Sequence, residues 1–297
     1  MEHGARQLDH PPRPGHNPVT RRRTLEHQRH SLAEIRGIMN SMKTLAYLET
    51  RKLTRFLDAQ LAVVRTIEAA AADLLSFHPE ILPRAQAATP VFLLIGADRG
   101  FCGDFNRALL RQLEATRQAG PVDNPAMIAI GRKLHVLLDR DTRVVAWING
   151  AALVEEITAV LKQLAEEIIS LQRQHEALEV FCIYHGSEDG VVMQRLLPPF
   201  EGLADRPPAY SHPPLLNLSP PALLAELTDQ YLFAALHALL YTSLMMENHH
   251  RVTHLDGAVK HLDDQSKDLA RQCNALRQEE IIEEIEVILL STTSLGE

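Results

Sequence analysis

The residues best suited to chemistry gather in one glycine-rich segment, Gly96-Ala97-Asp98-Arg99-Gly100-Phe101-Cys102-Gly103. It follows an apolar run that predicts a strand and precedes a run that predicts a helix, as a phosphate-binding loop does in a doubly wound sheet. It fits neither GxGxxG nor GxxxxGK[ST], and it lacks the lysine that would reach phosphates. No conventional base accompanies Asp98, Arg99 or Cys102. We therefore interpret Cys102 as a packed thiol and the glycines as parts of a tight turn, with nucleotide binding as the alternative.

A second candidate site is a group of histidines, His249, His250, His254 and His261. His250 and His254 are one helical turn apart and His261 lies seven residues further on, so these three share a helix face. Zinc sites use such spacing, but the HExxH motif is absent and the third ligand is nearly two turns away. We expect a polar helix face and no cofactor, and a metal site is the alternative.

A run of glutamates near the end of the chain fills five of the eight positions 279–286. Such a run is usually a solvated helix face. Here it alternates with Ile281, Ile282 and Ile285, which predicts an amphipathic helix able to lie in an apolar collar. These three groups together predict no catalytic site, so we expect a chain that is not itself an enzyme.

Composition narrows the class of protein. The 297 residues carry a net charge of −8, which argues against a nucleic-acid partner. Three scattered cysteines, Cys102, Cys182 and Cys273, show no metal or disulfide spacing and indicate a reducing, cytoplasmic setting. No apolar run approaches the roughly 20 residues that span a bilayer, and the first residues lack the apolar core of a signal peptide. Any membrane role is expected to be peripheral.

Two long helices are predicted at the ends of the chain, over residues 24–80 and 219–297. In the first, Thr24 can cap the start, Pro79 ends the helix, and mostly apolar residues recur at alternating spacings of three and four. These positions are Leu25, Gln28, Leu32, Ile35, Met39, Met42, Ala46, Glu49, Leu53, Phe56, Gln60, Val63, Ile67, Ala70 and Leu74. The second has a similar seam at Leu255, Val259, Leu262, Ser266, Leu269, Cys273 and Leu276. Two such stripes predict an antiparallel α-helical coiled coil, and the Pro- and Arg-containing residues 1–23 predict a disordered tail.

Residues 88–218 predict an α/β domain inserted between these helices. Candidate strands are Val91–Gly96, Met127–Gly131, Thr142–Trp147 and Glu179–His185, and candidate helices are Asn106–Arg117, Lys133–Asp139 and Ala151–Gln174. Their alternation predicts a small, Rossmann-like parallel sheet with helices on its faces. The expected fold class is therefore α/β plus a long antiparallel coiled coil.

Several short motifs, taken in their order along the chain, resemble those of one protein family. Ile38–Arg51 (IMNSMKTLAYLETR) is similar to a stretch reading roughly ITKAMEMVAASKMR, with Met42 on its methionine. Asp98–Gly103 with Asn106 resembles SDRGLCGGLN, and Glu247 with Arg251 resembles SExxxRM. The closing segments are Gln194-Arg195-Leu196-Leu197-Pro198, similar to QLLPL, and Asn274-Ala275-Leu276-Arg277-Gln278 followed by Ile281, Glu284 and Ile285, similar to YNKARQASITQELTEI. Over about residues 25–295 the chain resembles gamma subunits of F-type ATP synthases.

The resemblance implies a central-stalk rotor that couples proton or sodium flow across a membrane to ATP synthesis or hydrolysis. It implies partners in the alpha and beta subunits of the catalytic head, the epsilon subunit and the membrane c-ring. It further implies a peripheral position on the cytoplasmic face of a bacterial inner membrane. Met42, Arg251, Gln278 and Glu284 match positions where the family's shaft faces the head.

Some residues depart from the family pattern. Glu49 stands where the family usually has lysine, and Ile282-Glu283 replaces Thr-Gln. These departures indicate a divergent bacterial branch and leave open an alternate, sodium-linked complex. Two other classes stay open from the residues alone, a coiled-coil scaffold without ATPase partners and a Rossmann-like binding protein or oxidoreductase.

Overall fold

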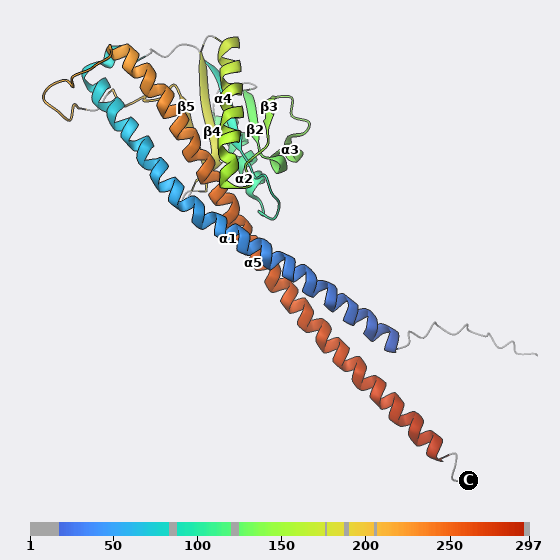
Figure 1. Ribbon diagram of the computed structural model, residues 1–297. Helices are drawn as coiled ribbons and strands as arrows, with labels where there is room; N and C mark the ends of the chain where they lie inside the picture. The colour runs from blue at the N-terminus through green and yellow to red at the C-terminus, as the bar shows by residue number, and fades with distance from the viewer. Residues whose placement is uncertain are drawn as a thin grey trace, which may run out of the picture. The chain divides into compact units, whose positions relative to one another are not determined.

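The computed structural model describes residues 18–82, 88–119, 125–175, 177–186, 190–204 and 207–293. By their contacts, the described residues form two compact units. The first unit contains residues 18–42 and 256–293, and the second contains Lys43–Leu255. Two long helices, α1 (Pro18–Phe77) and α5 (Pro220–Thr293), each contribute to both units (Figure 1).

Helix α1 begins earlier than the sequence predicted. Thr24 lies inside the helix, where its hydroxyl donates to the Thr20 carbonyl over 3.0 Å, so it is not the N-cap. The part of the predicted tail that the structure describes, residues 18–23, is helical, and residues 1–17 lie outside the described residues. The end of α1 was predicted correctly: the helix stops at Phe77, and a short 3₁₀ turn, η1, starts at Pro79.

In the first unit, α1 and α5 lie side by side and run in opposite directions. The Arg22 guanidinium pairs with the Glu280 carboxylate at 3.0 Å, and Arg36 pairs with Asp263, so later residues of α1 meet earlier residues of α5. The predicted apolar positions of α5 in this unit face inward. Val259, Cys273 and Leu276 are buried, and Leu262, Ser266 and Leu269 are half-buried.

In the second unit the same two helices are again antiparallel, but the buried stripe of α1 differs from the predicted one. The Gln60 amide donates to the Ala234 carbonyl over 3.1 Å, and the ring of Phe56 stacks on Tyr241. The predicted positions Phe56 and Val63 are each 46% exposed. Their neighbours Leu57, Val64 and Ala71 are buried instead. From Leu53 onward, the inward-facing residues of α1 recur at spacings of four and then three residues. The predicted seam used three and then four, so every second predicted position is off by one residue.

The second unit also holds a five-stranded sheet. Its strands are β1 (Thr89–Ile95), β2 (Ala126–Ile130), β3 (Val144–Ile148), β4 (Leu178–His185) and β5 (Val191–Leu197), in the order β3-β2-β1-β4-β5. The pairs among β1–β4 are parallel, as predicted, whereas β5 pairs antiparallel with β4. The sheet is therefore mixed. The sequence did not predict strand β5, whose apolar residues are interrupted by Gln194 and Arg195.

Helices cover both faces of this sheet (Figure 1). On one face, α4 (Ile157–Gln174) and the second-unit parts of α1 and α5 enclose one apolar core. A short 3₁₀ turn, η2 (Val154–Glu156), directly precedes α4. On the other face, α2 (Phe105–Ala119) and α3 (Arg132–Leu138) enclose a second core. The carboxyl end of β1 and the start of α2 frame the glycine-rich loop between these layers. No helix in the described part of the chain has the length and apolar character needed to cross a bilayer.

Candidate functional site

The glycine-rich loop joins β1 to α2 and has an unusual backbone. Phe101 and Gly103 both take left-handed conformations, with φ of 64° and 60°. For a side chain such as phenylalanine this conformation costs about 1–3 kcal/mol and persists only when surrounding contacts hold it. The loop therefore depends on partners outside itself.

The first attachment is made by the loop's own Asp98, whose buried side chain is 1% exposed. It accepts hydrogen bonds from the backbone N–H groups of Arg132 (3.2 Å) and Gly150 (3.0 Å) and from the Arg132 guanidinium. Asp98 thus ties the end of β1 to the first turn of α3 and to the segment after β3. Gly131, with φ of 111°, permits this approach, because a Cβ there would lie 2.6 Å from the Gly96 carbonyl oxygen.

The second attachment is made by α5, through three buried residues that we name the loop anchor: Glu247, Asn248 and Arg251. The Glu247 carboxylate accepts hydrogen bonds from the backbone N–H groups of Asp98 (2.9 Å) and Arg99 (3.1 Å). Arg251 pairs with Glu247, donates from Nε to the Gly100 carbonyl over 3.2 Å, and donates to the Asn248 amide oxygen over 2.6 Å. Successive polar groups of the loop backbone are thereby bound to one helix.

The anchor changes the interpretation of Arg251. The family resemblance implies a surface that faces another subunit, yet the Arg251 side chain is 4% exposed and its donors are used within the chain. Glu247 appeared in the sequence only as a motif match. Its four-residue spacing from Arg251, directly after the apolar run Leu244-Met245-Met246, was the signal that could have identified a buried pair.

Cys102 is a packed thiol, as predicted. Its Sγ lies 3.5 Å from the Arg99 carbonyl oxygen and 3.4 Å from that of Gly100, and the residue is 6% exposed. Burial, with a smaller effect of the Glu247 charge, raises the pKa of the Cys102 thiol to about 12. Because the thiolate is the reactive form, Cys102 is a poor nucleophile at neutral pH. The groups that the loop presents to solvent are the side chains of Arg99 and Phe101.

The histidines do not form a metal site in the described residues. His250 packs its ring against Phe105 and His185, and the His185 Nε2 lies 2.9 Å from the Phe105 carbonyl oxygen. His249 and His254 are exposed in the second unit, and His261 is exposed in the first, beside Gln265. Across the described ranges, no group of three or more His, Cys, Asp or Glu side chains is placed to hold a metal ion. The exposed side chains of His249, His254 and His261 agree with the polar helix face expected from the sequence, and the half-buried His250 does not.

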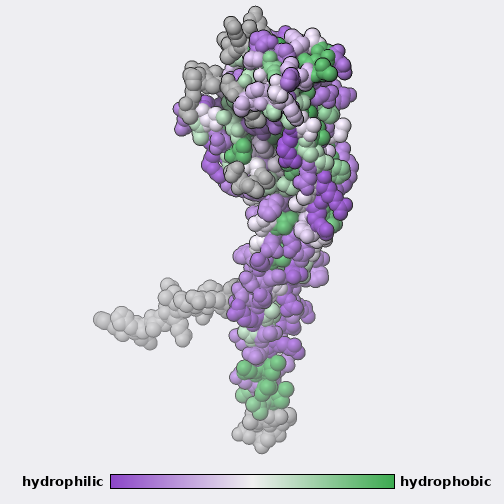
Figure 2. Space-filling view, turned by 90° about the vertical axis from the view of Figure 1, so that its left-hand side faces the viewer, coloured by the Kyte–Doolittle hydropathy of each residue, from purple (hydrophilic) through white to green (hydrophobic). Residues whose placement is uncertain are grey.

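The other residues that the sequence singled out lie on the two long helices. Met42 is half-buried, and Gln278 and Glu284 are exposed. Beyond Leu276, apolar side chains on α5 are exposed by 46–70%, and Figure 2 shows them as a green region at the end of that helix. They are Ile281, Ile282, Ile285, Val287, Ile288, Leu289 and Leu290. This segment presents exposed apolar side chains between glutamates, as an amphipathic helix does.

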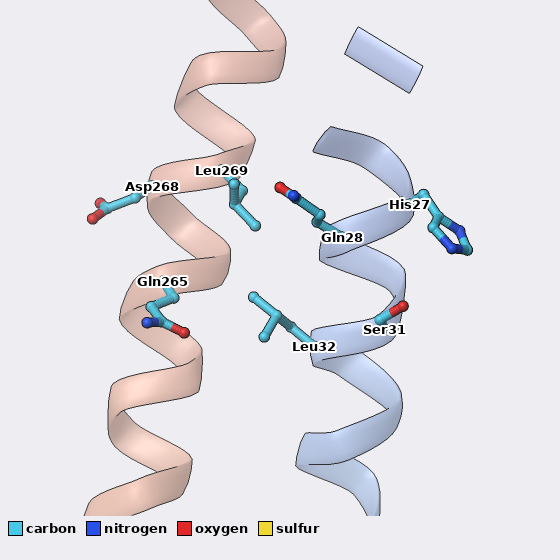
Figure 3. A pocket seen from close by; sticks show the side chains of 7 residues that line it. All are labelled: His27, Gln28, Ser31, Leu32, Gln265, Asp268 and Leu269. Carbon is cyan, nitrogen blue, oxygen red and sulfur yellow. The ribbon is translucent and has the colours of Figure 1, made fainter. Parts of the chain in front are cut away.

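A groove of about 500 Å³ lies between α1 and α5 in the first unit. Figure 3 shows Gln28 and Leu32 of α1 pointing toward Leu269 of α5, while His27 and Asp268 point outward. Gln28 occupies a position of the predicted apolar seam. The groove is lined by one seam leucine from each helix and by polar side chains, and it contains no arrangement of groups suited to catalysis.

Comparison with known proteins assigns the family. The family model described as ATP synthase matches residues 21–295. The chain is 26% identical over 283 residues to the ATP synthase gamma chain of Desulforamulus reducens, covering 92% of this chain and 98% of the relative. It is 25% identical over 272 residues to that of Clostridium botulinum (strain Kyoto / Type A2), covering 87% and 93%.

Solved structures share the fold. A chain in the Euglena gracilis mitochondrial ATP synthase rotor, in rotational state 1, has a TM-score of 0.58 at 16% identity, covering 89% of this chain and 99% of that one. A chain in the Euglena gracilis OSCP/F1/c-ring structure, in rotational state 3, has a TM-score of 0.61 at 14% identity, covering 93% and 95%. A family match across nearly the whole length, with gamma chains as the relatives, is decisive: the chain belongs to the ATP synthase family, among its gamma chains.

Proposed function

We propose that this chain is the central-stalk rotor of an F-type ATP synthase and that it has no catalytic site of its own. In this role it couples proton or sodium flow through a membrane ring to ATP synthesis or hydrolysis in a catalytic head. The observation that carries the proposal is the end of α5, where exposed Ile281, Ile282 and Ile285 alternate with glutamates. A helix with this surface fits an apolar collar formed by other subunits.

The shaft of this rotor is an antiparallel coiled coil of α1 and α5. Support comes from the ion pair between Arg22 and Glu280 in the first unit and from the contact between Gln60 and Ala234 in the second. We retain the division of the chain into a tail at 1–23, a helix at 24–80, an α/β domain at 88–218 and a helix at 219–297 as a functional proposal. The α/β domain is then the part that faces the ring.

The proposed partners are the alpha and beta subunits of the head, the epsilon subunit and the c-ring. Gln278 and Glu284, which are exposed, and Met42, which is half-buried, are the proposed contacts with the head. Arg251 has a different proposed role: it holds the loop so that Arg99 and Phe101 are presented to a partner.

Coupling requires only that the rotor contact several equivalent sites differently. An asymmetric rotor presents a different part of its surface to each equivalent site of the catalytic head at any instant. Differential contact shifts each site toward a different state, and rotation passes those states around the ring. The proposed location is the cytoplasmic face of a bacterial inner membrane, held there through the partners rather than through a membrane span of this chain.

The experiment is co-purification of the tagged chain from cells that express the complete ATP synthase, with ATP hydrolysis as the readout. We expect head and ring subunits in stoichiometric amounts and ATP hydrolysis by the assembled complex. The isolated chain is expected to hydrolyse no ATP above a preparation that carries Arg99→Ala. Failure to recover head subunits, or ATP turnover by the isolated chain that Arg99→Ala abolishes, contradicts the proposal.

A further inference from the structure

A hollow of about 400 Å³ lies in the second unit, at the amino ends of the parallel strands. Its floor is apolar and buried, formed by Leu178 of β4, Leu197 of β5, Phe200 and Leu224 of α5. An engineered apolar cavity of about 150 Å³ holds one benzene molecule, so this hollow has room for a larger apolar group. Its volume falls in the range of about 300–1,000 Å³ that is typical of sites for small molecules.

Three residues with polar side chains line this hollow. Gln172 of α4 and Thr228 and Asp229 of α5 are its polar lining residues. The Asp229 carboxylate has no ion pair or hydrogen bond with any described residue, and it is exposed. A negative charge at the mouth of an apolar hollow is complementary to a molecule with an apolar body and a positively charged end.

The backbone at this site is held in an uncommon conformation. Phe200 has φ of 68°, and its ring contacts Tyr231 with centroids 5.0 Å apart. Non-glycine residues in the left-handed region are concentrated at ligand clamps and functional sites. This conformation places Phe200 among the residues that line the hollow, between the end of β5 and α5.

We propose that this hollow binds an amphipathic monocation, with its apolar body against Leu178, Leu197 and Leu224 and its charged end beside Asp229. The proposal is independent of the rotor function, because none of these residues belongs to the loop anchor or to the proposed head contacts. A neutral amphiphile can make only the apolar contacts with the floor. An anionic amphiphile is in addition repelled by the Asp229 carboxylate.

The test is isothermal titration of the purified full-length chain with three probes that share a decyl tail, each below its critical micelle concentration. The probes are decyltrimethylammonium, decyl maltoside and decyl sulfate. We expect one molecule of the cationic probe to bind per chain, about threefold weaker binding of the maltoside, and still weaker binding of the sulfate, as one exposed charge implies. Equal binding of the cation and the sulfate, or no binding of the cation, overturns the proposal.

Two pairs of variants locate the site. Ala225→Trp fills the hollow from an exposed helix position, whereas Ala222→Trp places the same ring on the same helix at an exposed position that does not line it. Binding of the cation should be lost in the first variant and kept in the second. Asp229→Asn should weaken binding of the cation about threefold, as expected for loss of an exposed ion pair, and leave the maltoside unchanged. Glu226→Gln, exposed on the same helix but outside the hollow, should change neither.

The remaining outcomes count against the proposal. Binding that survives Ala225→Trp in a variant with unchanged melting temperature places the probe elsewhere. Loss of probe binding when the chain is assembled into the complex shows that another subunit covers the hollow and that it is an interface rather than a small-molecule site.

Discussion

Glu247 and Arg251, one turn apart on α5, form an ion pair in which each side chain is 4% exposed. The pair is also the attachment of the 98–103 loop, since Glu247 binds two N–H groups of the loop and Arg251 binds a carbonyl. Removing one member leaves the other charged and buried, which is the costly way to break such a pair.

Arg251→Met is therefore expected to lower the free energy of unfolding by about 3–5 kcal/mol. Glu247→Gln keeps an oxygen that can accept from the N–H groups of Asp98 and Arg99. The double variant should then cost less than the sum of the two single variants by about 0.5–3 kcal/mol. Urea denaturation of the four proteins measures this cycle. Strict additivity indicates that the two side chains act independently and contradicts the anchor.

Stability is expected to fall as the pH drops below about 6.5. Burial lowers the pKa of His185 below its ordinary 6.5, and burial with repulsion from His249 does the same for His250. The unfolded chain binds more protons than the folded chain in this range, so this part of the stability is complete above pH 6.5 and is lost on acidification. Urea midpoints at about pH 7.5 and about pH 5.5 measure the effect. His250→Gln should reduce the difference and the exposed control His254→Gln should not; equal differences in both variants exclude this cluster as its source.

The thiol of Cys102 is expected to resist alkylation in the folded chain. Burial raises its pKa to about 12 and also blocks access, and burial raises the pKa of the fully buried Cys182 as well. Iodoacetamide at about pH 8, followed by peptide mass spectrometry, should label neither residue until urea is added. Rapid labelling of Cys102 without urea indicates that the loop opens and that the anchor does not hold it.

Facing positions on α1 and α5 should cross-link within one chain. Arg36 and Asp263 form an ion pair in the first unit, so cysteines at both positions lie within reach of a short bis-maleimide. The matched control pairs Arg36→Cys with Asp264→Cys, which is on the next residue of α5 and exposed. The expected product is a cross-linked monomer, at higher yield for position 263 than for position 264. Cross-linked dimers as the main product support a self-associating scaffold and contradict an intramolecular shaft.

Met42→Lys tests the proposed contact with the head. Met42 is half-buried, and a lysine there can form an ion pair with a carboxylate on a surrounding subunit. Such pairs range from negligible to a few kcal/mol, and rotation must break the pair at every step. The reconstituted complex should assemble normally and pump fewer ions per ATP, while Met42→Leu should behave as the parent. A lowered melting temperature of the isolated chain, with unchanged pumping per ATP, assigns Met42 to the internal packing of the helices instead.

Local patterns in the sequence correctly predicted several strands, one helix end and part of one buried helix face. The four parallel strands, the end of α1 before Pro79 and the inward positions of Val259, Cys273 and Leu276 all follow from apolar runs, periodicity and a helix breaker. The motifs that resemble the gamma chains were also local, and the family match over residues 21–295 agrees with them. Cys102 could be predicted to be a packed thiol because no conventional base accompanies it in the sequence.

The rest depended on contacts between residues far apart in the chain. The antiparallel pairing of β5 is set by β4, and the buried stripe of α1 in the second unit is set by the residues of α5 that pack against it. Spacings of three-then-four and four-then-three share half their positions, so periodicity alone does not choose between Val63 and Val64. The loop anchor joins residues about 150 positions apart. Sequence identified Asp98, Glu247 and Arg251 as motif residues, but only the tertiary structure shows that Arg251 is buried against the loop, because burial depends on what other segments cover a side chain.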